Sequence, residues 1–225
     1  MNMKLEELIG EASTHLVSAS IGQKIFSVHP SVVTDLLNLK QAADQAGFNL
    51  HIASGFRSFE RQLAIWNGKM SGDIALLGKH GQKLDITLLS EEEKINSILR
   101  WSALPGGSRH HWGTDFDVYD RGALSDGTVL KLESWEYLQG HQKQFYHWLK
   151  GNLTHYGFFF PYTEDSSGVG FEPWHISHHV SSNECLKQLN VEMLYAKISS
   201  SNLIGKQGVL ANINDIYRRY INIKS

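Results

Sequence analysis

Hydrophobic residues recur at helical spacing along much of the chain, and short apolar runs separate these stretches. The first stretch begins with Pro30, which suits the first turn of a helix, and ends with Gly47, which suits a helix end. Ser58 is a suitable N-cap for a second helix, and Ser90 with Glu93 forms the capping box of a third. The pattern predicts helices at 30–47, 59–69, 90–101, 142–156, 183–198 and 207–222.

The short apolar runs between these helices are typical of β-strands. We expect strands at 50–53 and 158–160, a bent strand at 108–119, and a strand at 169–176 after a polar loop at 163–168. Because helices flank several short strands without regular β–α alternation, the pattern predicts an α+β fold. No internal repeat or flexible linker is present, so we expect one domain, residues 1–225, with a helical C-terminal extension at about 181–225.

The composition removes several classes of protein. A folded chain of 225 residues and 25.4 kDa buries roughly 70% of its extended surface and needs no disulfides to hold a core. The single cysteine, Cys185, excludes an internal disulfide framework and a cysteine-based zinc finger. A net charge of −2 and a pI near 6.6 argue against a general nucleic-acid binder. No apolar run approaches the roughly 18 residues of a membrane span, so we expect none.

The beginning of the chain lacks the features of a secretory signal. Glu6, Glu7 and Glu11 interrupt the apolar residues there, and no small-residue cleavage site follows. A secretory signal has a charged start and roughly 7–15 unbroken apolar residues. We therefore expect a cytoplasmic protein, and a periplasmic or cell-envelope location stays open if a leader was trimmed.

Three segments combine polar side chains at high density, at 54–58, 108–117 and 171–175. The 12 histidines of this near-neutral chain also invite metal chemistry. A hydrolytic zinc site takes three nitrogen or oxygen ligands from the protein and leaves a fourth position for water. The second and third segments contain the residue types that such a site needs.

These two segments can form a zinc site if the chain bends twice. His110 and Asp117 would lie on opposite faces of a regular strand, unless a turn at Gly113 brings them to one side. A bend at the intervening proline would do the same for Glu172 and His175. The arrangement that we infer binds zinc through His110, Asp117 and His175. Glu172 then lies beside the activated water, takes its proton and passes it to the leaving amine.

The same segments resemble a known family of zinc peptidases. The run S-x-H-x-x-G-x-x-x-D at 108–117, followed by E-P-W-H at 172–175 and preceded by S-G-F-R-S at 54–58, resembles the VanY-type D-alanyl-D-alanine carboxypeptidases. Their group trims bacterial peptidoglycan stem peptides and includes D-Ala-D-Ala dipeptidases and some phage endolysins. The resemblance covers roughly residues 30–180, which we take as the catalytic unit, and implies a small antiparallel sheet packed against helices.

The resemblance also implies a role for individual residues. It makes His110, Asp117 and His175 the zinc ligands and Glu172 the catalytic base. It places Arg57 in the substrate pocket, where its guanidinium holds a carboxylate or the developing oxyanion.

Some further residues match the pattern of this family, and one departs from it. Ser108 and Gln62 match positions that line the family's substrate pocket. Asp115 stands where the family usually has a small residue, so we expect an altered pocket shape or charge. His111, His178 and His179 are expected to support the site or lie on the surface, because three ligands already fill the zinc position.

These observations predict a zinc-dependent carboxypeptidase that removes a C-terminal D-amino acid from a peptidoglycan stem peptide or its recycled fragments. Within the same family, a D-Ala-D-Ala dipeptidase and a peptidoglycan endopeptidase remain alternatives, and the choice between D,D and L,D bonds is open. A non-catalytic, zinc-containing peptide-binding protein is the alternative from a different class. An unrelated amidase-like zinc hydrolase is a third, and it would be indifferent to a free substrate carboxylate.

Overall fold

The computed structural model describes residues 2–163 and 168–223 and contains two antiparallel sheets. A hairpin pairs β1 (Val17–Ile21) with β2 (Lys24–Val28). The larger sheet has the strand order β3 (Leu50–Ser54), β4 (Asp115–Asp120), β6 (His175–His178) and β5 (Phe158–Phe159). The α+β class with a small antiparallel sheet flanked by helices is confirmed.

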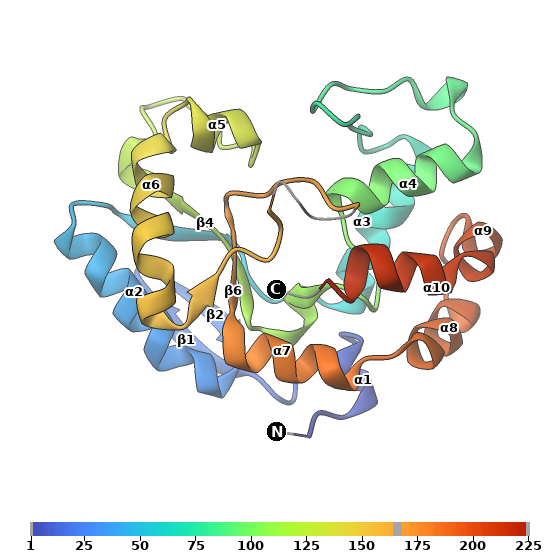
Figure 1. Cartoon of the computed structure of the whole chain (residues 1–225), viewed down its shortest axis with the longest axis horizontal. Coiled ribbons are helices and arrows are strands. Elements are labelled where there is room, and N and C mark those ends of the chain that lie inside the picture. Colours follow the sequence, from blue (N-terminus) through green and yellow to red (C-terminus); the bar gives the residue numbers. More distant parts are fainter. Residues whose placement is uncertain (1, 164–167, 224–225) are drawn as a thin grey trace.

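Helices make up much of the remaining chain (Figure 1). The α-helices are α1 (Leu5–Leu8), α2 (Val33–Gln45), α3 (Phe59–Ser71), α4 (Glu91–Trp101), α5 (Ser134–Leu138), α6 (Lys143–Asn152), α7 (His179–Gln188), α8 (Val191–Ser200), α9 (Lys206–Ala211) and α10 (Ile213–Ile216). Short 3-10 turns lie at Pro30–Val32, Ile86–Leu88, Arg109–Trp112, Arg121–Ala123 and Leu153–Tyr156, and a π-turn follows α10 at Tyr217–Ile221. No helix of the described residues is long and apolar enough to cross a membrane.

Local signals in the sequence set two helix starts. The Ser58 hydroxyl accepts the Arg61 N–H at 3.2 Å and caps α3. At α4 the Ser90 hydroxyl accepts the Glu93 N–H, and the Glu93 carboxylate accepts the Ser90 N–H at 2.8 Å, which is the predicted capping box. Both predictions are confirmed.

One hydrophobic cluster joins α2 and α6 to the larger sheet. Phe116 and Val118 of β4 and Ile176 of β6 point into it and are fully buried. Because side chains alternate along a strand, Asp115, Asp117 and His175 lie on the other face of the same strands. The sheet thus has one apolar face against helices and one polar face.

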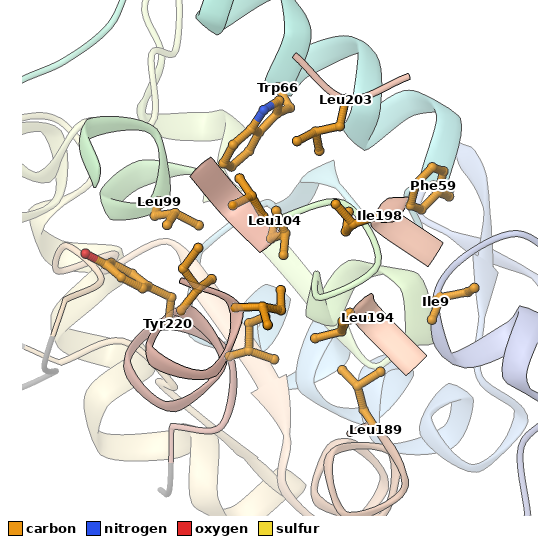
Figure 2. Close-up of a cluster of buried hydrophobic side chains, with 14 of the residues drawn as sticks. Ile9, Phe59, Trp66, Leu99, Leu104, Leu189, Leu194, Ile198, Leu203 and Tyr220 are labelled. Carbon is orange, nitrogen blue, oxygen red and sulfur yellow. The ribbon is translucent and has the colours of Figure 1, made fainter. Parts of the chain in front are cut away.

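A second cluster lies among the helices on the other side of the molecule (Figure 1). Figure 2 shows Phe59 of α3 near Ile198 of α8 at one end of this cluster and Tyr220, near the C-terminus, next to Leu99 of α4 at the other. Burial of each such side chain contributes about 1.5–3 kcal/mol. The C-terminal helices therefore share a core with α3 and α4.

Several predicted boundaries differ from the observed ones. The strand expected at 108–119 begins only at Asp115, because Arg109–Trp112 form a 3-10 turn and Gly113 adopts φ 68°. The strand expected at 169–176 begins at His175, because a turn precedes it. Four of the six residues of the expected loop at 163–168 lie outside the described residues.

The helical C-terminal region contains more breaks than the pattern predicted. The helix expected at 183–198 is two helices, because Asn190 caps a new one by accepting the Met193 N–H at 2.9 Å. The helix expected at 207–222 is interrupted at Asn212 and ends in the π-turn. The β1–β2 hairpin was not predicted.

Candidate active site

The sheet register brings Asp117 and His175 together. Asp117 of β4 lies directly opposite His175 of β6, with Asp117 Oδ1 3.3 Å from His175 Nδ1. Their side chains share the polar face because Phe116 and Ile176, also paired, point to the opposite one. Two of the predicted ligands therefore meet through strand pairing.

The third predicted ligand, His110, reaches this face through the turn at Gly113. A Cβ at residue 113 would lie 2.5 Å from a Leu16 methyl, and its φ of 68° also favours glycine. The turn places His110 Nε2 3.5 Å from Asp117 Oδ2 and the His110 ring centroid 4.8 Å from that of His175. The bend that the seven-residue spacing required is thus present.

The three side chains have the properties of a metal site. Ligand atoms from His110, Asp117 and His175 all lie within 4.8 Å of one another, and all three residues are buried. Burial lowers the pKa of His110 to about 3, against the attraction of Asp117, so the imidazole is neutral and able to coordinate a metal ion. Asp117 Oδ1 is buried without a hydrogen-bond partner among the described residues. Two imidazoles and one carboxylate suit zinc.

Asp115 does not face the pocket but supports His175 from behind. Its Oδ1 lies 3.0 Å from His175 Nε2 and accepts the Arg109 Nε–H at 2.9 Å. Burial opposes the charge on Asp115, but Arg109 and His175 outweigh it and hold the pKa of Asp115 below its usual range. His175 Nε2 therefore donates its proton in a hydrogen bond to Asp115, and Nδ1 is the ring nitrogen that faces Asp117 and could bind a metal ion. The three carboxylates around it, Asp115, Asp117 and Glu172, raise the pKa of His175 against the effect of burial, so binding of a metal ion would displace the proton from Nδ1. Asp115 was expected to alter the shape or charge of the pocket. In the structure it does not line the cavity and instead contacts the far side of the His175 ring.

Glu172 reaches the same cluster through a tight turn. The His175 N–H donates to the Glu172 carbonyl at 3.1 Å across Pro173 and Trp174, the bend expected at this proline. The turn places Glu172 Oε2 3.4 Å from His175 Nδ1. Burial raises the pKa of Glu172, although the neighbouring His175 lowers it. A carboxylate with a raised pKa beside a metal cluster is suited to accept and return a proton.

Arg57 lies at the edge of the cluster in a fixed position. Its Nη2 donates to Ser54 Oγ at 2.8 Å and lies 3.9 Å from Asp117 Oδ2, while its Nη1 donates to Gln62 Oε1 at 2.9 Å. Gln62 also donates to the Ala103 carbonyl at 2.7 Å and is fully buried. Gln62 does not line the cavity, so the structure places it behind Arg57 rather than toward a substrate.

A cavity of about 300 Å³ opens onto this cluster and contains most of the predicted site residues. Arg57, Ser108, His110, Asp117, Glu172 and His175 line it. The sequence analysis missed other lining residues, among them Lys69, Trp101, Lys131, Tyr162 and Tyr220. One signal was present in the sequence: Lys69 follows Gln62 by two helical turns and lies on the same face of α3.

The three additional histidines lie outside the cavity lining. His111 Nε2 accepts the Gly106 N–H at 3.1 Å and its Nδ1 lies 2.6 Å from the Arg57 carbonyl, so this ring braces the Arg57 turn. Burial lowers its pKa to about 4. His178 is buried with its Nε2 3.0 Å from Asp35, and His179 is exposed.

The chain is similar to other proteins in sequence. An uncharacterized protein of Haemophilus influenzae is 34% identical over 121 residues, which are 52% of this chain and 92% of that protein. A D-alanyl-D-alanine carboxypeptidase of Enterococcus faecalis is 29% identical over 143 residues, which are 62% of this chain and 44% of that protein. This chain thus spans less than half the length of the enterococcal protein.

The fold is similar to those of solved structures. VanYB in complex with D-Ala-D-Ala superposes with a TM-score of 0.55 at 20% identity, covering 86% of this chain and 88% of VanYB. A mutant of the vancomycin-resistance D,D-pentapeptidase VanY in complex with Zn(II) gives 0.52 at 22% identity, covering 87% and 91%. The LD-carboxypeptidase LdcB gives 0.53 at 18% identity, covering 92% and 78%. At these identities the likeness establishes the fold.

The family model supplies the remaining comparison. The model of VanY, D-alanyl-D-alanine carboxypeptidase, matches residues 26–181, well over half of the chain. The matched segment contains all three polar segments described above and ends just after β6. The chain therefore belongs to the VanY D-alanyl-D-alanine carboxypeptidase family.

Proposed function

We propose that this protein is a zinc-dependent carboxypeptidase that removes a C-terminal D-amino acid, D-Ala, from peptidoglycan-derived peptides. One observation carries the proposal: His110, Asp117 and His175 converge in one cavity, with Glu172 beside them. The membership of the VanY family supports the choice of substrate. VanYB, which shares the fold, is described in complex with D-Ala-D-Ala.

Each side chain of the site has its own role in the proposed hydrolysis. Zinc held by His110, Asp117 and His175 would supply Lewis acidity to the scissile carbonyl oxygen and to the attacking water. Glu172 takes a proton from that water and delivers it to the departing amine nitrogen, so the peptide C–N bond breaks to give a free acid and a free amine. Its position in a turn next to His175 keeps its carboxylate close to the reacting atoms.

Arg57 supplies positive charge at the same end of the cavity. Ser54 and Gln62 hold two of its nitrogen atoms, so little side-chain freedom is lost when an anion binds. The guanidinium faces the negative charge that develops on the carbonyl oxygen, or a carboxylate of the substrate. Gln62 acts through Arg57 and is a positioning residue.

The test is hydrolysis of defined peptides by the zinc-loaded protein before and after chelation. We expect release of a single D-Ala from a stem pentapeptide, loss of activity with chelator and recovery on addition of zinc. Release of D-Ala-D-Ala would identify a dipeptidase, cleavage of a crosslinked dimer an endopeptidase, and release of D-Ala from a tetrapeptide an L,D-carboxypeptidase. Binding of these peptides without any hydrolysis would refute the proposal in favour of a binding protein.

A further inference from the structure

Lys69 brings a second cation into the catalytic cavity. It lines the cavity together with Arg57 and Glu172, on a helix face whose other polar residue, Gln62, holds Arg57. Its ammonium donates to Ser102 Oγ at 2.6 Å, and Gln62 donates to the carbonyl of the adjacent Ala103 at 2.7 Å. α3 and residues 102–103 therefore form one wall of the cavity.

No carboxylate of the described residues forms an ion pair with Lys69. Burial lowers its pKa to about 8, the charge of Glu172 raises it, and that of Arg57 lowers it further. A lysine ammonium is seldom buried without a partner, because removal from water penalises the charge. The Ser102 hydroxyl supplies one acceptor, and the attraction of Glu172 reaches the ammonium without an ion-pair contact.

Arg57 and Lys69 are not equivalent. Arg57 is held by two side chains and lies 3.9 Å from Asp117 Oδ2, so it is next to the proposed metal ligands. The Lys69 side chain is attached to α3 about 10 Å farther along the helix axis than the Gln62 side chain, because the two residues are seven apart and each adds 1.5 Å of helix length. A substrate that engages both cations presents a second negative group beyond its reacting carbonyl.

We propose that Lys69, with Ser102 beside it, is a specificity-determining residue that binds a carboxylate of the substrate. The inference rests on the function proposed above and assigns Lys69 to one of the carboxylates near the scissile bond. Two sources have this chemistry: the C-terminal carboxylate of the residue removed, and a side-chain carboxylate on the residue before it. A lysine suits either, because its ammonium is a compact point charge with three donors.

The experiment compares three probes on four proteins. The probes are a D-Ala-terminated peptide with uncharged side chains, the same peptide with glutamate directly before the D-Ala, and the first peptide as its C-terminal amide. The proteins are the zinc-loaded wild type, Lys69→Met, Lys69→Arg and Lys131→Met. Lys131 is an exposed lysine of the same cavity, so Lys131→Met removes the same charge and reports any general attraction of anions.

Lys69→Met should raise KM by about 10- to 100-fold with a small change in kcat, as expected for loss of a hydrogen bond to a charged group. Lys69→Arg should restore most of the loss, and Lys131→Met should change KM severalfold at most. If Lys69→Met raises KM for both peptides with a free C-terminus but not for the amide, Lys69 binds the C-terminal carboxylate. If Lys69→Met raises KM only for the peptide with glutamate, Lys69 binds the side-chain carboxylate.

Equal KM values for Lys69→Met and wild type with every probe would overturn the proposal. So would a loss that appears only in kcat, or one matched by Lys131→Met. Equilibrium binding of the same probes to the Glu172→Gln variant, with and without Lys69→Met, separates this proposal from the function. If the probes bind more weakly after Lys69→Met but the wild type does not cleave them, the proposed carboxypeptidase activity is refuted and the role of Lys69 is kept. If the probes bind to Glu172→Gln neither with nor without Lys69→Met, both proposals are refuted.

Discussion

Asp115 allows a sharp test of how the protein would prepare the proposed metal site. The substitution Asp115→Asn keeps the shape of the side chain but removes the charge that His175 Nε2 meets at 3.0 Å and Arg109 Nε at 2.9 Å. Loss of such a partner behind a ligating histidine lowers metal affinity by about 10- to 100-fold. This range corresponds to about 1.4–2.7 kcal/mol of binding free energy. We expect the zinc affinity of Asp115→Asn to fall within it.

The same substitution also leaves a buried cation without its counter-ion. Arg109 keeps hydrogen bonds to Ser177 and Ser182, both at 2.7 Å, but loses its only carboxylate among the described residues. Breaking a buried ion pair from one side costs about 3–5 kcal/mol of stability. We therefore expect the metal-free Asp115→Asn protein to be less stable to urea by about 3 kcal/mol or more.

A double variant separates the two effects. Arg109→Met with Asp115→Ala removes both charges, and such apolar replacement of a buried pair is often close to neutral. Its free energy of unfolding, measured with chelator present, should recover most of the loss. Its zinc affinity, measured by competition with a chromophoric chelator, should stay low because His175 still lacks its acceptor. Zinc affinity within threefold of wild type in both variants would show that Asp115 serves only to neutralise Arg109.

Three further predictions concern the base, the arginine clamp and the buried histidines. Glu172→Gln should lower kcat by about 10²- to 10⁴-fold with the zinc content unchanged, and near-normal turnover would show that Glu172 is not the base. Gln62→Ala frees Arg57 and should lower kcat/KM about tenfold, as for one hydrogen bond to a charged group, and activity equal to that of the wild type would contradict this role. Burial lowers the pKa values of His29 and His111 to about 4, so only the unfolded chain takes up protons as the pH falls from about 6.5 toward 4. Stability in urea is then full above pH 6.5 and about 2 kcal/mol lower per histidine at pH 5, and a flat profile for the metal-free protein would refute this assignment.

Short-range signals in the sequence predicted the elements that position the site. Ser58 and Ser90 marked helix starts because an N-cap acts within one turn of its own position. The need for a turn at Gly113 followed from the spacing of His110 and Asp117, and the structure contains that turn. The motif residues therefore meet as expected, although their chemical roles remain predictions.

Features that depend on contacts between distant segments could not be predicted in the same way. Asp115 was expected to alter the pocket, and only the β4–β6 register shows that it stands behind His175. Lys69 carried a helical spacing signal, but its place in the cavity depends on the packing of α3 against residues 102–103. The β1–β2 hairpin has two residues, Gly22 and Gln23, between its strands, a signal that could have revealed it.

Tyr220 brings the C-terminal region of the chain to the wall of the cavity. The residue lies beyond the segment that the family model matches, yet its ring forms part of the cavity wall and packs against Gly168, where an added Cβ would lie 2.9 Å from it. A part of the chain outside the matched segment thus supplies one piece of the wall around the proposed catalytic groups. A substitution at Tyr220 would change the shape of the cavity without replacing any of the proposed catalytic groups.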